Sequence, residues 1–181
     1  MQALKYLAGY PSHWLAAAQH LLEQGRVGEA MAQRHGPVHG LRTDGALYDF
    51  VAEQKARFLR HAGPISKVAY DAKLQPVQHA LGLQTRISRV QGGRLAARRE
   101  IRVASVFRQA PAPFLRMVVV HELAHLKHAE HDKAFYALCT HMEPDYHALE
   151  FDLRLWLCSL EAATPHDTVA PAPMHLASGC A

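Results

Sequence analysis

Two histidines four residues apart, His121 and His125, enclose Glu122 in a largely apolar stretch of the chain. On an α-helix, positions i and i+4 lie on one face about a turn apart, so both imidazoles can reach a single metal ion. Glu122 lies about 100° around the helix from His121, where a carboxylate can touch a water on that ion without binding the ion itself. The spacing therefore predicts a metal centre that activates water for hydrolysis.

The residues around this motif favour a metal site over a chance match. Residues 114–120 are almost wholly apolar, and the apolar run continues into Leu123, Ala124 and Leu126, which predicts a buried helix. Buried histidine and glutamate side chains are costly without partners, and a metal ion supplies one. The alternative is a pair of core histidines held by backbone carbonyls beside a structural glutamate, in a chain that contains 14 histidines.

The third ligand has to come from the residues that follow the motif, because catalytic zinc usually has three protein ligands and one open position for water. His131 is the first candidate, provided that the chain turns back after residue 128. Asp132 supports such a turn because it is a good N-cap for a following helix. Glu150 is the second candidate and Glu143 a further one. His128 lies about 7–8 Å along the helix axis from the midpoint of the first two ligands, which is too far on a straight helix.

Zinc at this site would lower the pKa of a coordinated water to about 7 and polarise the oxygen next to the scissile bond. Glu122 would act as the catalytic base, taking the proton of the attacking water and passing it to the leaving group. Imidazole ligands also suit manganese and nickel, so these metals remain alternatives. We expect contacts with the substrate or its developing oxyanion from four residues: Arg89, Arg94, Tyr146 and His147.

Length and composition favour one globular domain inside the cell. A chain of 181 residues with 49% hydrophobic content can bury a sizeable core. No apolar run approaches the length needed to span a bilayer, so we expect no membrane partner. The amino terminus shows neither a basic cluster nor the apolar core of a secretory signal. The three cysteines have no metal-type spacing, and we expect a reducing, cytoplasmic location without a disulfide framework.

Hydrophobic periodicity divides the chain into three predicted regions of an α+β protein. Residues 1–62 are expected to form an N-terminal helical extension, with Ser12 and Thr43 as helix caps. Residues 63–161 are expected to form the catalytic domain, and residues 162–181 a disordered tail. The extension and its surroundings contain six histidines that we expect to face solvent: His13, His20, His35, His39, His61 and His79.

The catalytic domain is predicted to contain a small antiparallel sheet packed on the metal-binding helix and the helices after it. Residues 65–70, 83–90 and 95–107 have the character of strands, and Gly92-Gly93 joins the last two in a hairpin. Two further helices are expected, one beginning after Asp132 and one over about residues 144–160.

Positive charge is concentrated in the predicted hairpin and the linker after it. Residues 86–116 carry eight arginines and one acid, Glu100, so this stretch is +7 in a chain of net charge +4. Arginine binds phosphate through paired hydrogen bonds, which suits a nucleotide substrate or nucleic acid. The alternative is a solvated strand face paired with acids at 143–152. The arginines are Arg86, Arg89, Arg94, Arg98, Arg99, Arg102, Arg108 and Arg116.

Several longer motifs occur together between Ile65 and Leu160. They are SRVQGG at 88–93, EIRVA at 100–104, APAPFLR at 110–116, HELAH at 121–125, HDKAFY at 131–136, HMEPDYH at 141–147, EFD at 150–152 and RLW at 154–156. In this combination the chain closely resembles the YgjP-like metallopeptidase family. The resemblance implies a minimal zincin-like fold, related to SprT-like and WLM-type proteases.

The resemblance also implies a ligand set and two activities. It assigns His121, His125 and His131 to the metal and Glu122 to the base. Proteins of this family are also labelled as nucleoside-triphosphate (UTP) pyrophosphatases, which would give the arginines a direct use. We therefore expect first a zinc-dependent metallopeptidase whose peptide substrate pairs with the sheet edge, and second a UTP pyrophosphatase. The third expectation is a nucleic-acid-binding module, through the arginine-rich hairpin, with a structural metal site.

Overall fold

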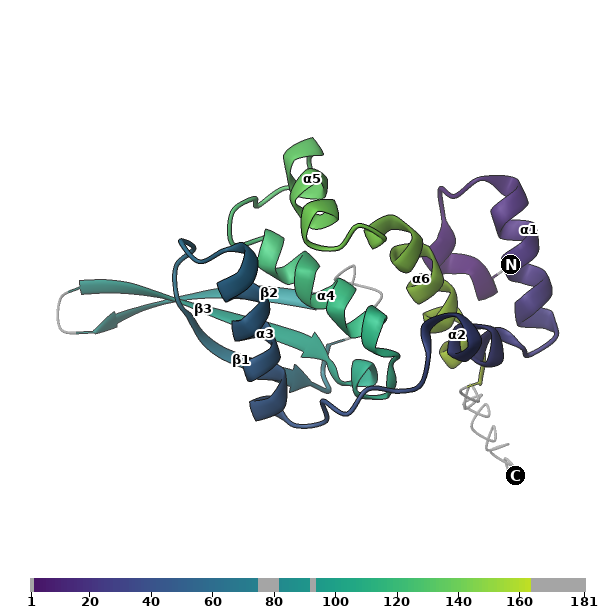
Figure 1. Ribbon diagram of the computed structural model, residues 1–181, viewed down its shortest axis with the longest axis horizontal. Helices are drawn as coiled ribbons and strands as arrows, with labels where there is room; N and C mark the ends of the chain where they lie inside the picture. Colours follow the sequence, from purple (N-terminus) through teal and green to yellow (C-terminus); the bar gives the residue numbers. More distant parts are fainter. Residues whose placement is uncertain (1, 75–81, 92–93, 164–181) are drawn as a thin grey trace, which may run out of the picture.

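The computed structural model of the protein describes residues 2–74, 82–91 and 94–163, and at residues 2, 3, 5, 82–91 and 94–98 it describes the backbone alone. These residues form an α+β fold, as predicted (Figure 1). Its elements in chain order are η1 (Gln2–Leu7), α1 (Ser12–Glu23), α2 (Val27–His35), α3 (Asp44–Phe58), β1 (Ile65–Asp71), β2 (Gly82–Gln91), β3 (Arg94–Ala104), η2 (Ser105–Gln109), α4 (Ala112–Ala124), α5 (Lys133–Met142) and α6 (Tyr146–Ala163).

The sheet has three strands in the order β1-β3-β2, with β3 in the centre. Strands β2 and β3 form the predicted antiparallel hairpin and reach past the helices (Figure 1). Strand β1, however, runs parallel to β3, so the prediction of an antiparallel sheet is wrong for this pair. Strand β2 pairs with one edge of β3, and β1 pairs with the other edge. Pairing between strands that are not consecutive in the chain leaves no signal in the local pattern.

Helices α3 and α4 cover one face of the sheet. Val68 and Tyr70 of β1 pair in register with Ile101 and Val103 of β3, and all four side chains are buried. Helix α4 lies in the middle of the molecule, with the sheet on one side and α6 on the other (Figure 1). This central position explains why α4 is apolar on nearly every side: a helix buried all round has no solvent face to keep polar.

The N-terminal elements η1, α1 and α2 pack against α6. Nη1 of Arg34 donates to both carboxylate oxygens of Asp152 at 2.8 Å, and Nε2 of His35 lies 2.7 Å from the same carboxylate. His39 is buried with Nε2 2.8 Å from the carbonyl oxygen of Phe107. The expectation that all six histidines face solvent is therefore wrong for His35 and His39, because each finds a polar partner far away in the sequence.

The remaining histidines of this set agree with the expectation where they are described. His13, His20 and His61 are exposed, and the side chain of His79 lies outside the described residues. Within the described residues, no helix combines the length and apolar character needed to cross a bilayer.

One hydrophobic cluster extends through the whole described structure. It joins Leu7 and Leu47 of the predicted extension to Val118 and Leu153 of the predicted catalytic domain. The boundary at residue 62 stays a prediction. Helix α6 continues to Ala163, two residues into the predicted disordered tail, and residues 164–181 lie outside the described residues.

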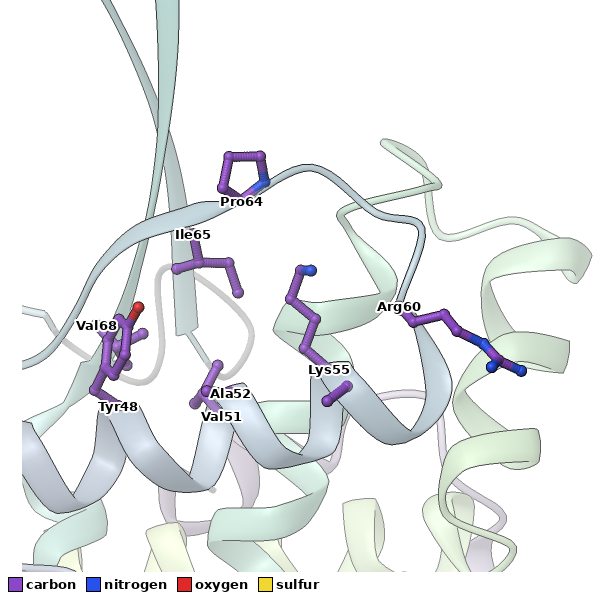
Figure 2. A pocket seen from close by; sticks show the side chains of 9 residues that line it. Tyr48, Val51, Ala52, Lys55, Arg60, Pro64, Ile65 and Val68 are labelled. Atoms are coloured by element: carbon purple, nitrogen blue, oxygen red, sulfur yellow. The ribbon is translucent and has the colours of Figure 1, made fainter.

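A pocket of about 320 Å³ lies between α3 and β1 (Figure 2). Lys55 extends across it toward Pro64 and Ile65, whereas the guanidinium of Arg60 points away. Histidine and carboxylate side chains are absent from the residues that line this pocket, so it is not the predicted metal centre. The lining residues are Tyr48, Val51, Ala52, Lys55, Ala56, Arg60, Pro64, Ile65 and Val68.

Two of the three predicted helix caps are present in the structure. Thr43 caps α3, because its hydroxyl accepts a hydrogen bond from the amide N–H of Ala46 at 3.1 Å. Asp132 caps α5 in the same way, with Oδ1 2.8 Å from the amide nitrogen of Phe135. Ser12 is not a cap: α1 begins directly after Pro11, and Ser12 is its first residue.

Replacing Thr43 with alanine removes the acceptor for the amide of Ala46, and we expect the free energy of unfolding to fall by about 1 kcal/mol. Urea denaturation followed by circular dichroism measures this change. Thr43→Ser keeps the hydroxyl and should unfold close to the wild-type midpoint. An equal loss in both variants would assign the effect to the methyl group instead of the cap.

Candidate metal centre

Three imidazole nitrogens meet at one point beside the end of α4. Nε2 of His131 lies 3.2 Å from Nε2 of His121 and 3.1 Å from Nε2 of His125. Nitrogen ligands about 2.0–2.1 Å from a tetrahedral zinc ion are roughly 3.3 Å apart. Among the described residues, this is the one group of histidine, cysteine and acidic side chains with the spacing of metal ligands. The donor set therefore fits a divalent cation.

The local sequence explains how the third histidine arrives. Helix α4 ends at Ala124 with His125 as its C-cap, a few residues before the turn that the sequence suggested at residue 128. The chain then reverses, and the cap by Asp132 starts α5 immediately after His131. This return places His131 against His121 and His125, the position that a third ligand of one metal ion requires.

Phe135 forms an aromatic surface under the three imidazoles. Its ring centroid lies 5.0 Å from that of His121, 4.6 Å from His125 and 4.7 Å from His131. The sequence indicates only that Phe135 belongs to the apolar face of its helix. Its contact with all three imidazoles depends on the packing of α5 against α4.

Two partners hold the Nδ1 atoms of His121 and His125. Nδ1 of His125 lies 3.0 Å from the carbonyl oxygen of His128, which can only accept, so this nitrogen carries the proton and Nε2 is left with its lone pair. Nδ1 of His121 lies 2.7 Å from the hydroxyl of Tyr146. Donation to this hydroxyl likewise leaves Nε2 of His121 available to a metal.

Burial keeps this region uncharged. It lowers the pKa of His121 to about 3, helped by the charges of His125 and His131, so His121 is neutral at neutral pH. The hydroxyl of Tyr146 also hydrogen-bonds the thiol of Cys139, and burial raises the pKa of both groups, that of Cys139 to about 12. Both stay protonated, and a neutral Tyr146 suits the role of a fixed partner for His121.

Glu122 is 1% exposed, and burial raises the pKa of its carboxyl to about 8. A divalent cation at the neighbouring imidazoles would favour the ionised form, because a bound cation is the largest local charge and opposes the effect of burial. The carboxyl of Glu122 is thus suited to exchange a proton near neutral pH when the site is loaded.

The other candidate ligands are committed elsewhere. Glu143 is buried in an ion pair with Arg116. Glu150 accepts from Arg154 at 2.7 Å. Neither belongs to the group of residues with ligand spacing, so His131 is the third ligand that the geometry supports.

The four residues predicted to contact the substrate differ in how well their positions fit that role. The prediction for Tyr146 does not fit its position, because the side chain has no exposed surface and its hydroxyl faces Nδ1 of His121. His147 is exposed and its ring lies 5.5 Å from that of Tyr136, on the side of the metal centre formed by α5 and α6. The side chains of Arg89 and Arg94 lie outside the described residues.

The backbone nevertheless limits what the hairpin arginines can reach. Nη1 of Arg99 donates to the carbonyl oxygen of Leu126 at 3.1 Å, which places this part of β3 next to the end of α4. Arg94 lies five residues away along the strand, a distance of about 17 Å. Arg89 pairs with Ala96, about 10 Å from Arg99 along the strand. The backbone at Arg89 is thus the nearer of the two.

The described arginines of the basic stretch have polar partners. Arg102 pairs with Asp71 at 3.0 Å, Arg108 with Asp44 at 3.5 Å, and Arg116 with Glu143. The sequence also allowed these arginines to pair with acids at 143–152. Among the described side chains, Arg116 alone forms such a pair. For the remaining four arginines the structure describes the backbone alone: Arg86, Arg89, Arg94 and Arg98.

Comparison with known proteins bears on the same residues. A family model described as a YgjP-like metallopeptidase domain matches residues 66–155. A protein of Escherichia coli (strain K12) named UTP pyrophosphatase is 56% identical to the chain over 160 residues, which cover 88% of this chain and 96% of that protein. No solved structure matches the chain.

His131→Ala should reduce metal binding far more than His128→Ala, because it leaves two ligands where catalytic zinc usually has three. Metal content after dialysis, measured by mass spectrometry, should fall well below one ion per chain. His128→Ala is the matched control, since only the backbone carbonyl of His128 contacts a ligand. Full metal content in His131→Ala would exclude His131 as a ligand.

Tyr146→Phe removes the hydroxyl partner of His121 and keeps the ring. Partners of this kind typically account for a 10- to 100-fold difference in metal affinity, and we expect roughly that loss. Competition with a chromogenic chelator measures it. Tyr48→Phe, which changes a hydroxyl on α3 remote from the ligands, should keep the wild-type affinity. If both variants bind metal equally, Tyr146 does not orient His121.

Proposed function

The chain belongs to the YgjP-like metallopeptidase family, and on this premise we propose that it is a metal-dependent pyrophosphohydrolase that cleaves a phosphoanhydride bond of UTP, with zinc at the three histidines. One observation carries the proposal: Nε2 of His131 lies 3.1–3.2 Å from Nε2 of both His121 and His125, beside a buried glutamate, in a chain 56% identical to a protein named UTP pyrophosphatase. The sequence alone placed this activity second, behind a peptidase.

The three nitrogen donors suit zinc, with manganese and nickel as alternatives. A divalent cation held by His121, His125 and His131 would supply a Lewis acid that polarises a phosphoryl oxygen and makes a water more acidic. The chain's own contribution is to hold the imidazoles in one orientation, through Tyr146 and the carbonyl of His128. Side chains that are already oriented lose little freedom when the metal binds.

Glu122 is the base in this proposal. Its carboxylate accepts a proton from the water that attacks phosphorus, and it returns the proton to the phosphate oxygen released when the anhydride bond breaks. The enclosed position of Glu122 supports this role, because burial favours the protonated form that the second half of the reaction requires. Of the two hairpin arginines, Arg89 would hold the triphosphate, because the backbone at Arg94 lies about 17 Å along the strand from Arg99. His147 would contact the substrate from α6.

A metallopeptidase is the second candidate, and the description of the matching family favours it. Glu122 would perform the same proton transfers on a peptide bond. An extended peptide could pair with the outer edge of β2, which has β3 as its one neighbour among the described strands. Nucleic-acid binding through the hairpin stays a prediction, and salt-dependent oligonucleotide binding would test it.

Glu122→Gln should lower UTP hydrolysis by a factor of about 10² or more, the usual contribution of a general base. The metal content should stay at the wild-type level, because Glu122 is not a ligand. Release of phosphate products from UTP and of peptides from casein should be measured on the same metal-loaded preparations. Glu130→Gln, an exposed change of the same type, is the matched control.

The outcomes separate the candidates. Wild-type turnover of UTP that Glu122→Gln abolishes supports the proposal. Cleavage of casein without turnover of UTP would replace it with the peptidase. A wild-type rate of UTP hydrolysis in Glu122→Gln would show that the base is another group.

A further inference from the structure

A polar stripe runs along one face of α6, close to the metal centre. His147, Glu150 and Arg154 stand at positions i, i+3 and i+7, which share a helix face. Nε and Nη2 of Arg154 donate to Oε1 of Glu150 at 3.2 and 2.7 Å. Nδ1 of His147 lies 3.8 Å from Oε2 of Glu150. Apart from the contact expected of His147, the hydrolytic centre described above gives these groups no task.

Tyr136 of α5 connects this stripe to the metal ligands. Its ring centroid lies 6.3 Å from that of His131 and 5.5 Å from that of His147. The three rings thus follow one another from the ligand to the stripe. His131 and His147 are exposed and Tyr136 is half-buried, so this row of rings is accessible to a molecule bound at the metal.

The N-terminal segment bounds the stripe on its other side. Nη1 of Arg154 donates to the carbonyl oxygen of Tyr6 at 3.3 Å, and the guanidinium also hydrogen-bonds the hydroxyl of Tyr10. Glu150 and Arg154 are half-buried between this segment and α5. Their side chains therefore have fixed positions.

The charges in the stripe indicate what it can bind. Glu150 and Arg154 cancel one another, so the pair has little attraction for a phosphate group. It does offer a carboxylate acceptor and guanidinium donors side by side, next to the π-face of Tyr136. This combination suits a flat, neutral heterocycle that carries both N–H and C=O groups on one edge.

We propose that Tyr136, His147, Glu150 and Arg154 form the subsite for the uracil base of the substrate. The inference rests on the proposed function, and it identifies the residues that would select UTP as the substrate. The base would stack on Tyr136, with the N–H at position 3 of uracil donating to Glu150 and a uracil carbonyl accepting from Arg154. The phosphates would then extend toward His131 and the other ligands.

A purely structural role is the competing explanation, because Arg154 also fastens the N-terminal segment to α6. A structural role would affect every ligand of the metal centre alike. A base subsite affects ligands that carry a base and leaves inorganic triphosphate unaffected. The experiment therefore compares UTP with inorganic triphosphate on the same variants.

Tyr136→Leu should raise the KM for UTP about tenfold or more, since stacking on an aromatic side chain contributes substantially to base binding. Inhibition by inorganic triphosphate, measured as a Ki, should stay within about twofold of the wild type, because the phosphates do not touch Tyr136. Tyr136→Phe retains the π-face and should recover most of the affinity for UTP. Metal content is measured in parallel, because Tyr136 adjoins a ligand.

Glu150→Gln tests the hydrogen bond to the base. Position 3 donates in uracil and accepts in cytosine, so a carboxylate discriminates between UTP and CTP, whereas an amide can turn to serve either. We expect the ratio of kcat/KM for UTP to that for CTP to fall about tenfold, as expected for a lost polar discrimination. Glu130→Gln should leave this ratio unchanged.

Two results would overturn the inference while leaving the proposed function intact. One is equal weakening of UTP and inorganic triphosphate in Tyr136→Leu, and the other is an unchanged KM for UTP. Absence of UTP turnover by the metal-loaded wild type would instead overturn the proposed function, and the inference with it.

Discussion

The constraint on which the structure depends is the convergence of three imidazole nitrogens at the end of a buried helix, where Nε2 of His131 lies 3.2 and 3.1 Å from Nε2 of His121 and His125. Protonated imidazoles would repel one another at this separation, so the site requires neutral rings with their lone pairs turned inward. Burial of α4 between the sheet and α6 keeps His121 neutral, and Tyr146 and the carbonyl of His128 set the orientation of the rings. The same burial that makes α4 almost wholly apolar is therefore what prepares its few polar groups for a metal.

The rest of the fold supports this helix from several sides. The sheet covers one side of α4 and α6 covers another, while α5 returns His131 and places Phe135 under the ligands. Helix α6 contributes Tyr146 to the centre, and it also receives the N-terminal helices through Asp152 and Arg154. A single hydrophobic cluster connects these parts.

The geometry of the metal centre says more about the type of reaction than about the identity of the substrate. A cation, a water and a buried carboxylate hydrolyse a peptide bond or a phosphoanhydride bond by the same proton transfers. Selection between them has to come from residues around the centre. The stripe on α6 is electrically neutral and flanked by aromatic rings, whereas the backbone of the arginine-rich hairpin extends away from the helices (Figure 1). The neutral stripe therefore suits an uncharged heterocycle, and the positive hairpin suits an anionic group.

Local sequence patterns were enough to predict those features that depend on residues close together in the chain. The spacing of His121 and His125, the cap by Asp132 and the hairpin between β2 and β3 depend on residues within a few positions of one another. Glu150 and His131 remained competing ligands in the sequence, because the choice depends on where α5 and α6 pack. The parallel pairing of β1 with β3, the contact of His35 with Asp152 and the position of Tyr146 behind His121 were likewise decided by tertiary contacts. Periodicity and spacing describe one segment at a time, whereas these contacts join segments whose proximity is set by the shared core.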